Sequence, residues 1–196
     1  SLPIATVLAV TFGTLVVITV VIVLGITLVS GITNTRDLLI DKAGTAMEAA
    51  ENDLRDLLNP AAFQARYMAE LIRDGKLDTD NSKQLSDFLL GAVAGTPQIT
   101  SLTYVTSSFQ VTAASRETHS IITMDESNDP VAVSAIGELA QNAEGSWGPL
   151  VYVPTLDNTV LNFRQPVVRD GSFLGAIIAT IAISSVNTRM ATAPVL

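Results

Sequence analysis

The residue whose chemistry most clearly points to a ligand is Arg164, in the segment TVLNFRQPVV (159–168). Alternate side chains of a β-strand point to opposite faces, so Arg164 shares a face with Asn162 and Pro166 and lies opposite Phe163. If the apolar face packs on a helix, the guanidinium group faces a pocket, where it would hold a carboxylate through two hydrogen bonds. The alternatives are an exposed arginine on a solvated face and an arginine paired with an internal acid.

Three aromatic residues and a second arginine could complete such a pocket. Tyr104, Tyr152 and Trp147 combine flat apolar walls with polar tips, and Arg116 ends a predicted strand in SRETHS (115–120). Each of these side chains is also compatible with ordinary packing. We predict that a small carboxylate is bound by the set Arg164, Tyr104, Tyr152, Trp147 and Arg116.

The motifs of enzyme chemistry are missing from the sequence. There is no Gly-x-Ser-x-Gly elbow, no glycine-rich phosphate loop and no His-Glu-x-x-His pair. Cysteine is absent, His119 is the single histidine, and the acidic loop 125–129 does not match the calcium-binding loop. We therefore predict no catalytic residue, no metal and no cofactor in this chain, which is not expected to be an enzyme by itself.

The overall charge narrows the class of partner. The 196 residues carry a net charge of −8, with a pI of about 4.4. Phosphate backbones select basic surfaces, so this acidic balance argues against a nucleic-acid partner.

A long uncharged segment, PIATVLAVTFGTLVVITVVIVLGITLV, opens the chain, and the first ionisable side chain is that of Arg36. A helix needs roughly 20 apolar residues to cross a bilayer, and this run is longer. The alternative, a cleavable signal peptide, would have an apolar region of roughly 7–15 residues behind a positive flank, and neither condition holds. We predict a transmembrane helix over residues 1–33, in contact with membrane lipid.

Small residues recur within this predicted membrane helix. Ala5, Ala9 and Gly13 are four residues apart, and Gly25 falls near the same stripe. Such spacing lets two helix backbones approach closely, so we predict packing against a second copy or against partner membrane subunits. The alternative is that alanine and glycine are simply frequent in membrane helices.

Residues 34–96 follow a helical pattern. A stalk helix begins near Arg36, and Asn59-Pro60 should break or kink it. A second helical stretch over residues 61–74 should end at Gly75, which suits a left-handed C-cap. Asn81 or Ser82 should cap a third helix that runs to about Ala94. That helix should bury Leu85, Phe88, Leu89 and Val93.

Residues 97–196 are predicted to form mainly strands. Two strands over 99–106 and 109–116 precede a polar loop, and Asp129-Pro130 should start a short helix. Three more strands follow, over 148–154, 159–168 and 172–184, the last two joined by the turn Asp170-Gly171. This order predicts an α+β class, with a five-stranded antiparallel sheet flanked by helices.

The final strands carry a family resemblance. Trp147 precedes a strand, and Pro166-Val167, Asp170-Gly171 and Leu174-Gly175 follow it. This pattern, behind a membrane helix and a stalk, resembles the Cache sensor domains of bacterial receptors, which are extracytoplasmic relatives of PAS domains. The resemblance implies a PAS-like sheet over 97–196. Amino-acid-binding Cache domains carry an Arg-x-Trp-Tyr arrangement that is missing around Trp147, so their residue roles are not carried over.

The opening segment LPIATVLAVTFGTLVV is also similar to the first span of membrane-bound class III adenylate or guanylate cyclases. Those proteins place a Cache-like sensor between two spans, ahead of a cytoplasmic catalytic domain. This resemblance implies a second span just beyond Leu196.

Together these features predict the ligand-sensing domain of a receptor in the bacterial inner membrane. Few Lys or Arg residues follow the span, which favours a soluble domain in the periplasm. The receptor would relay ligand occupancy through the membrane helix to a cytoplasmic output domain. The alternative is a structural accessory subunit of a larger membrane complex, docked by its transmembrane helix.

Overall fold

The computed structural model describes residues 3–142, 144–153 and 157–184, without the side chains of residues 5–7 and 9–11. The chain divides into two compact units, Ser1–Asn52 and Asp53–Leu196. The helix α1 (Ile4–Arg73) contributes to both units, which are described separately below.

The part of α1 in the first unit has the character of a membrane span. Its length and composition are sufficient for crossing a bilayer, and its apolar side chains are exposed. The hydroxyl groups of Thr19, Thr27 and Thr33 donate to carbonyl oxygens four residues earlier, at 2.8–2.9 Å. Such bonds satisfy hydroxyl groups inside the helix itself, as a lipid environment requires.

The predicted packing stripe is described only in part. Gly13 and Gly25 are surrounded by open space, with nothing within 4 Å of an added Cβ atom, so a second helix has room to approach there. The side chains of Ala5 and Ala9 lie outside the described residues. Helix packing through this stripe stays a prediction.

In the second unit, α1 continues through Pro60, so the break predicted as one of two effects of Asn59-Pro60 does not occur, while the predicted kink stays a prediction. Proline removes one backbone donor, but the turns around it bury Leu57, Ala61 and Ala65 in the core. This packing outweighs the lost hydrogen bond, and the helix runs on to Arg73.

The end of α1 confirms the prediction for Gly75. Gly75 has a φ of +71°, and its N–H donates to the Ile72 oxygen at 3.0 Å. The N–H of Lys76 donates to the Leu71 oxygen at 2.9 Å. These two bonds are those of a Schellman motif.

The next helix, α2 (Ser82–Gly95), is capped by Asn81 as predicted, because its Oδ1 accepts from the Gln84 N–H at 3.1 Å. Leu85, Leu89 and Val93 are buried, which confirms their assignment to the core. Phe88 is 42% exposed, so its predicted burial is wrong: it lies beside the buried stripe of the helix.

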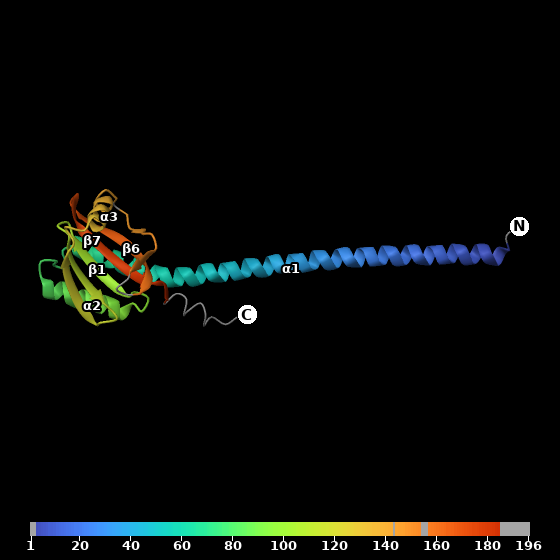
Figure 1. The fold of residues 1–196 in the computed structure, drawn as a ribbon, viewed down its shortest axis with the longest axis horizontal. Helices are drawn as coiled ribbons and strands as arrows, with labels where there is room; N and C mark the ends of the chain where they lie inside the picture. The colour runs from blue at the N-terminus through green and yellow to red at the C-terminus, as the bar shows by residue number, and fades with distance from the viewer. Residues whose placement is uncertain (1–2, 143, 154–156, 185–196) are drawn as a thin grey trace. The chain divides into compact units, whose positions relative to one another are not determined.

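Among the residues that the structure describes, the sheet has seven strands, in the order β3-β2-β1-β7-β6-β4, with β5 also paired to β6. Figure 1 labels its central strands β1, β7 and β6. All pairings are antiparallel. The strands are β1 (Ser101–Thr106), β2 (Gln110–Ser115), β3 (Ser120–Asp125), β4 (Ser146–Trp147), β5 (Val151–Val153), β6 (Asn158–Arg169) and β7 (Ser172–Ala182).

The sheet contains more strands than the five predicted. Residues 120–125, predicted as part of a polar loop, form the edge strand β3, in which Ser120 pairs with Ser115. The predicted strand 148–154 is replaced by β4 and β5, which both pair with β6. The antiparallel α+β class itself is confirmed.

The two faces of the sheet are covered by different helices. Side chains of α1 and α2 form one core with Leu102, Phe163 and Ile177. On the other face, α3 (Pro130–Ala140) packs Ile136 and Leu139 against Val105, Val111 and Ala176. Asp129 caps α3 as predicted, because its Oδ1 accepts from the Val131 N–H at 2.8 Å.

The β6–β7 hairpin has the predicted two-residue turn. Asp170 and Gly171 have φ values of 51° and 77°, and Arg169 pairs with Ser172. Positive φ at both central residues belongs to the turns that match the twist of a hairpin. The hairpin brings the two longest strands of the sheet side by side.

Candidate ligand-binding site

Arg164 lies on the face of the sheet that α3 covers. Phe163 belongs to the core on the α1 side, where the guanidinium of Arg66 lies 5.0 Å from its ring centre. The next residue of β6 therefore points to the opposite face. This placement confirms the alternation predicted for the segment 159–168.

The register across the sheet defines the neighbours of Arg164. Arg164 pairs with Ser146 of β4 on one side and with Ile178 of β7 on the other, and Ile178 pairs in turn with Thr103 of β1. In the adjacent row, Asn162 pairs with Thr180. On the other side, Pro166 pairs with Ala176, so the register gives Arg164 only neutral neighbours on this face.

The guanidinium of Arg164 is held close to a glycine. A Cβ atom on Gly148 would lie 2.9 Å from its Cζ and Nη2 atoms. The Gly148 N–H donates to the backbone carbonyl oxygen of Asn162 at 2.8 Å, so this glycine is fixed against β6. Within the described part of the chain, the guanidinium has no hydrogen bond or ion pair with another protein group. Its five N–H donors therefore remain free to bind an anion.

Asn162 adds a second unusual feature to the same strand face. Its Oδ1 is buried and accepts no hydrogen bond from the described residues. Buried polar atoms without a partner are rare and costly, so each needs an explanation, such as a bound water molecule or a role in function. Asn162 was noted in the sequence only as a neighbour of Arg164, and nothing in the sequence singles out Gly148.

The other predicted binding residues do not gather around Arg164. Tyr104 lies in the core on the α1 side, and its hydroxyl donates to the Leu174 oxygen at 3.2 Å. Burial raises the pKa of Tyr104, so its hydroxyl stays neutral near pH 7. Trp147 also faces the α1 side, where its ring meets the Phe163 ring edge-on at 5.1 Å.

Tyr152 and Arg116 lie elsewhere. Tyr152 is 57% exposed, and its hydroxyl donates to Asp157 at 2.7 Å, which raises the pKa of the tyrosine. Arg116 donates to the oxygens of Ile99 and Thr96, both at 2.8 Å, and to that of Val93. It therefore closes the C-terminal end of α2. The predicted set is divided among four places, of which only that of Arg164 leaves a charged group without a partner.

A groove of about 600 Å³ lies on the other side of the sheet, between α1 and β6. Arg66, Glu70, Arg73 and Glu144 contribute charges of both signs to its lining. Arg73 already pairs with Asp74 at 3.3 Å. The two arginines and two glutamates of the groove balance each other in charge, so the lining does not favour a ligand of either sign.

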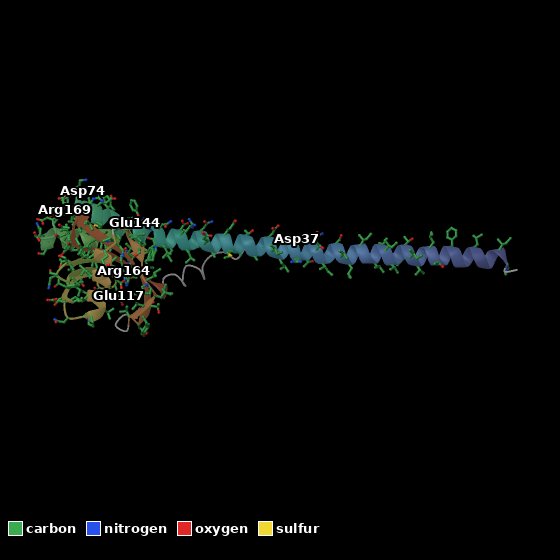
Figure 2. All side chains as sticks on the ribbon, turned by 90° about the horizontal axis from the view of Figure 1, so that it is seen from above. Asp37, Asp74, Glu117, Glu144, Arg164 and Arg169 are labelled. Carbon is green, nitrogen blue, oxygen red and sulfur yellow. The ribbon has the colours of Figure 1, made fainter. Side chains whose placement is uncertain are left out.

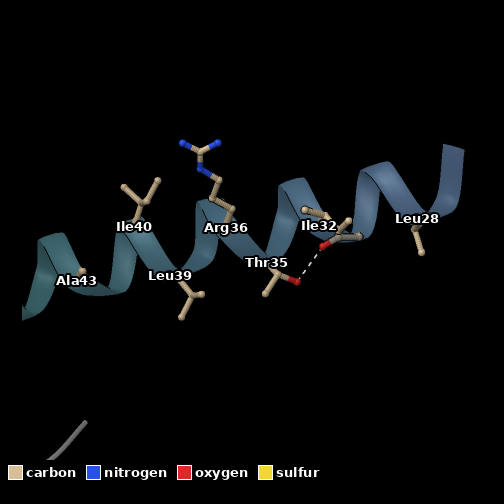
Figure 3. Close-up of a pocket in the computed structure, with 8 residues that line it drawn as sticks. Leu28, Ile32, Thr35, Arg36, Leu39, Ile40 and Ala43 are labelled. Carbon is tan, nitrogen blue, oxygen red and sulfur yellow. Dashed lines mark hydrogen bonds between the residues drawn. The ribbon is translucent and has the colours of Figure 1, made fainter. Parts of the chain in front are cut away.

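A shallower hollow lies on α1 in the first unit (Figure 3). All of its lining residues come from this helix, between Leu28 and Ala43. Thr35 donates to the Gly31 oxygen at 2.8 Å, and Arg36 and Leu39 point to opposite sides of the helix. One helix cannot enclose a ligand, so this hollow is a strip of helix surface. No cluster of three or more potential metal ligands occurs among the residues that the structure describes.

Comparison with known proteins identifies the fold. No protein-family model matches the sequence, and no curated protein matches it significantly. The structure is similar to the sensory domain of the Campylobacter jejuni chemoreceptor Tlp3, with a TM-score of 0.63 at 12% identity. This similarity covers 75% of the chain and 62% of Tlp3. The domain has the Cache-like fold of chemoreceptor sensory domains.

Two further structures support this assignment of the Cache-like domain. The extracellular domain of the putative histidine kinase soHK1S-Z6 has a TM-score of 0.61 at 11% identity, over 74% of this chain and 60% of that one. The ligand-binding domain of the amino-acid chemoreceptor PctC from Pseudomonas aeruginosa PAO1, in complex with GABA, has a TM-score of 0.59 at 14% identity, over 76% and 62%. The chain spans less than two thirds of the length of these structures. The Cache-like fold predicted from the final strands is confirmed.

Proposed function

We propose that this chain is the ligand-sensing part of a bacterial membrane receptor, anchored in the inner membrane by α1 with its Cache-like domain in the periplasm. The ligand is a small carboxylate bound by Arg164, and its occupancy is relayed through α1 to an output domain. The observation that carries this proposal is the unpartnered Arg164 guanidinium on the α3 side of a sensory-domain fold. The length and apolar composition of α1 support the membrane anchor.

The structure also offers a physical route for the relay. The strand β6 carries Arg164 and, five residues later, Arg169. Arg169, which is labelled in Figure 2, donates to the backbone oxygen of Arg73 at 2.8 Å and to that of Ile72. A shift of β6 on ligand binding would therefore be felt at the last turn of α1.

Carboxylate binding is testable by thermal unfolding of the full chain in lipid nanodiscs. We expect at least one of acetate, propionate, pyruvate, L-lactate and succinate to raise the midpoint by several degrees, because a ligand that binds only the folded state stabilises it. Arg164→Gln should abolish this shift, whereas Arg66→Gln, on the opposite face, should retain it. If no carboxylate stabilises the protein, or if Arg164→Gln responds as fully as the wild type, the proposed binding site is wrong.

The relay is testable by hydrogen–deuterium exchange of the same sample. We expect a stabilising carboxylate from this panel to slow amide exchange in the last turns of α1, around residues 69–77. In Arg169→Met the thermal shift should persist while the change in exchange at these residues is lost. Slowed exchange at α1 that survives in Arg169→Met would rule out this arginine as the link.

A further inference from the structure

The charges and hydrogen-bonding groups around Arg164 narrow the class of ligand. We infer that the site takes a carboxylate that carries a neutral hydroxyl or oxo oxygen beside it, and that it discriminates against ligands with an ammonium group. The inference rests on the proposed sensing function and names the ligand class of the same site.

No acidic side chain projects from the strands on this face. The register and the packing of α3 assign to it residues that are neutral except for one cation. These residues include Ser101, Thr103, Val105, Val111, Ala113, Ser115, Ser120, Ile122, Met124, Ser146, Asn162, Arg164, Pro166, Ala176, Ile178 and Thr180. An ammonium group taken into this surface would leave water for a site that offers it no countercharge and one repelling cation.

The acids nearest in sequence are engaged or placed elsewhere. Asp157 accepts from the Tyr152 hydroxyl, and Glu144 lines the groove on the α1 side. Glu138 is exposed on α3, and Glu126 lies in the connection before α3, where its N–H bonds to the Phe109 oxygen. The residues outside the described ranges contain no Asp or Glu. Within the part of the chain that the structure describes, none of these acids forms a hydrogen bond or ion pair with Arg164.

The neutral groups beside Arg164 suit an uncharged oxygen. The amide of Asn162 and the hydroxyl of Thr180 lie in the row next to Arg164, and the hydroxyl-bearing Ser146 pairs with Arg164 directly, whereas Thr103 lies two strands away. The buried Oδ1 of Asn162 needs a donor, and a ligand hydroxyl entering beside Arg164 would supply it. The carboxylate would meanwhile take the guanidinium donors.

This preference sets the chain apart from its structural neighbours. Tlp3 is known with isoleucine bound, and PctC with GABA, so both accept ligands that carry an amino group. A similar fold does not transfer a ligand, because specificity depends on the few polar groups of the site. The absence of an acid around Arg164 predicts a different selectivity.

Three acids of the same length separate these possibilities: L-lactate, L-alanine and propionate. They share a three-carbon carboxylate and differ in bearing a hydroxyl, an ammonium or neither. In calorimetric titrations of the full chain in nanodiscs, we expect L-lactate to bind about 10-fold to 100-fold more tightly than L-alanine. We expect L-lactate to bind about 10-fold more tightly than propionate, and Asn162→Leu to remove this second difference.

The outcomes distinguish the proposed carboxylate-sensing function from the inferred selectivity for a hydroxy or oxo acid. If L-alanine binds as tightly as L-lactate and both are lost in Arg164→Gln, the carboxylate site stands and the inference on selectivity is overturned. If propionate equals L-lactate in the wild type, the role of the neutral oxygen is overturned. If none of the three acids binds, the inference fails, and the proposed function fails as well only if acetate, pyruvate and succinate also leave the unfolding midpoint unchanged. Arg66→Gln serves as the control and should bind all three acids as the wild type does.

Discussion

Replacement of Gly175 with alanine is expected to destabilise the Cache-like domain by about 3–5 kcal/mol, which exceeds the effect of most single substitutions. Gly175 has a φ of +154°, a conformation that residues with a Cβ atom rarely adopt. An added Cβ would overlap the carbonyl oxygen of Val105 on the neighbouring strand and lie 3.1 Å from the Cα of Thr106. Because the obstacle is backbone in the middle of the sheet, the methyl group can be accommodated only by separating β1 from β7.

The measurement is urea unfolding of the full chain, followed by the fluorescence of its single tryptophan. Trp147 packs against Phe163, so its emission reports on the core. The matched control is Gly137→Ala on the exposed surface of α3, where nothing lies within 4 Å of an added Cβ. We expect that change to stabilise the domain by about 0.5–1 kcal/mol, since alanine favours a helix. If both alanine variants have the same stability, the close approach at Gly175 does not exist.

The sequence predicted those parts of the fold that depend on neighbours along the chain. The turn at Asp170-Gly171 was predicted correctly, as were the caps at Gly75, Asn81 and Asp129. In each case the side chain or the backbone conformation of one residue acts on groups only a few positions away. Such interactions are the same in any fold, so the residue types alone reveal them.

Two of the errors in the predicted fold have the opposite origin. Pro60 does not end α1 because the neighbouring turns are buried against the sheet, which the local sequence cannot show. The strand β3 was missed because its side chains are mostly polar or exposed, so alternation is weak there. Its pairing with β2 through Ser115 and Ser120 supplies the hydrogen bonds that define it. In both cases tertiary contacts override the local signal.

In the candidate site, too, features that depend on neighbouring residues were predicted, and features that depend on distant residues were not. The alternation of β6 was sufficient to predict that Arg164 and Phe163 face opposite sides. Tyr104 and Trp147 both lie on the α1 side of the sheet. This placement depends on the register of β1 against β7 and of β4 against β6, which pairs residues far apart in the sequence. Gly148 acquires its importance only from the guanidinium that lies against it. Residue types thus predicted the chemistry of the site, but not which residues would meet there.

Arg116 gives the sharpest contrast between the predicted and the observed role of a residue. It follows β2 directly, and its guanidinium donates to three carbonyl oxygens at the C-terminal end of α2 and just beyond it. We expect Arg116→Met to lower the free energy of unfolding by about 2–4 kcal/mol, because the partly buried oxygens lose charged donors and gain no replacement. The free energy of unfolding of Arg116→Lys should lie between those of the wild type and Arg116→Met. A lysine ammonium group keeps the charge, but it lacks the planar set of donors with which the guanidinium reaches all three oxygens.

The control for this change is Arg73→Met, an exposed arginine whose ion pair with Asp74 should contribute less than about 1 kcal/mol. The same samples test whether Arg116 also binds the ligand, as the sequence suggested. If its role is to hold α2 against the sheet, the folded fraction of Arg116→Lys should bind L-lactate with unchanged affinity, while unfolding occurs at lower urea. A lysine variant that keeps its stability and loses the ligand would reverse this assignment and return Arg116 to the binding site.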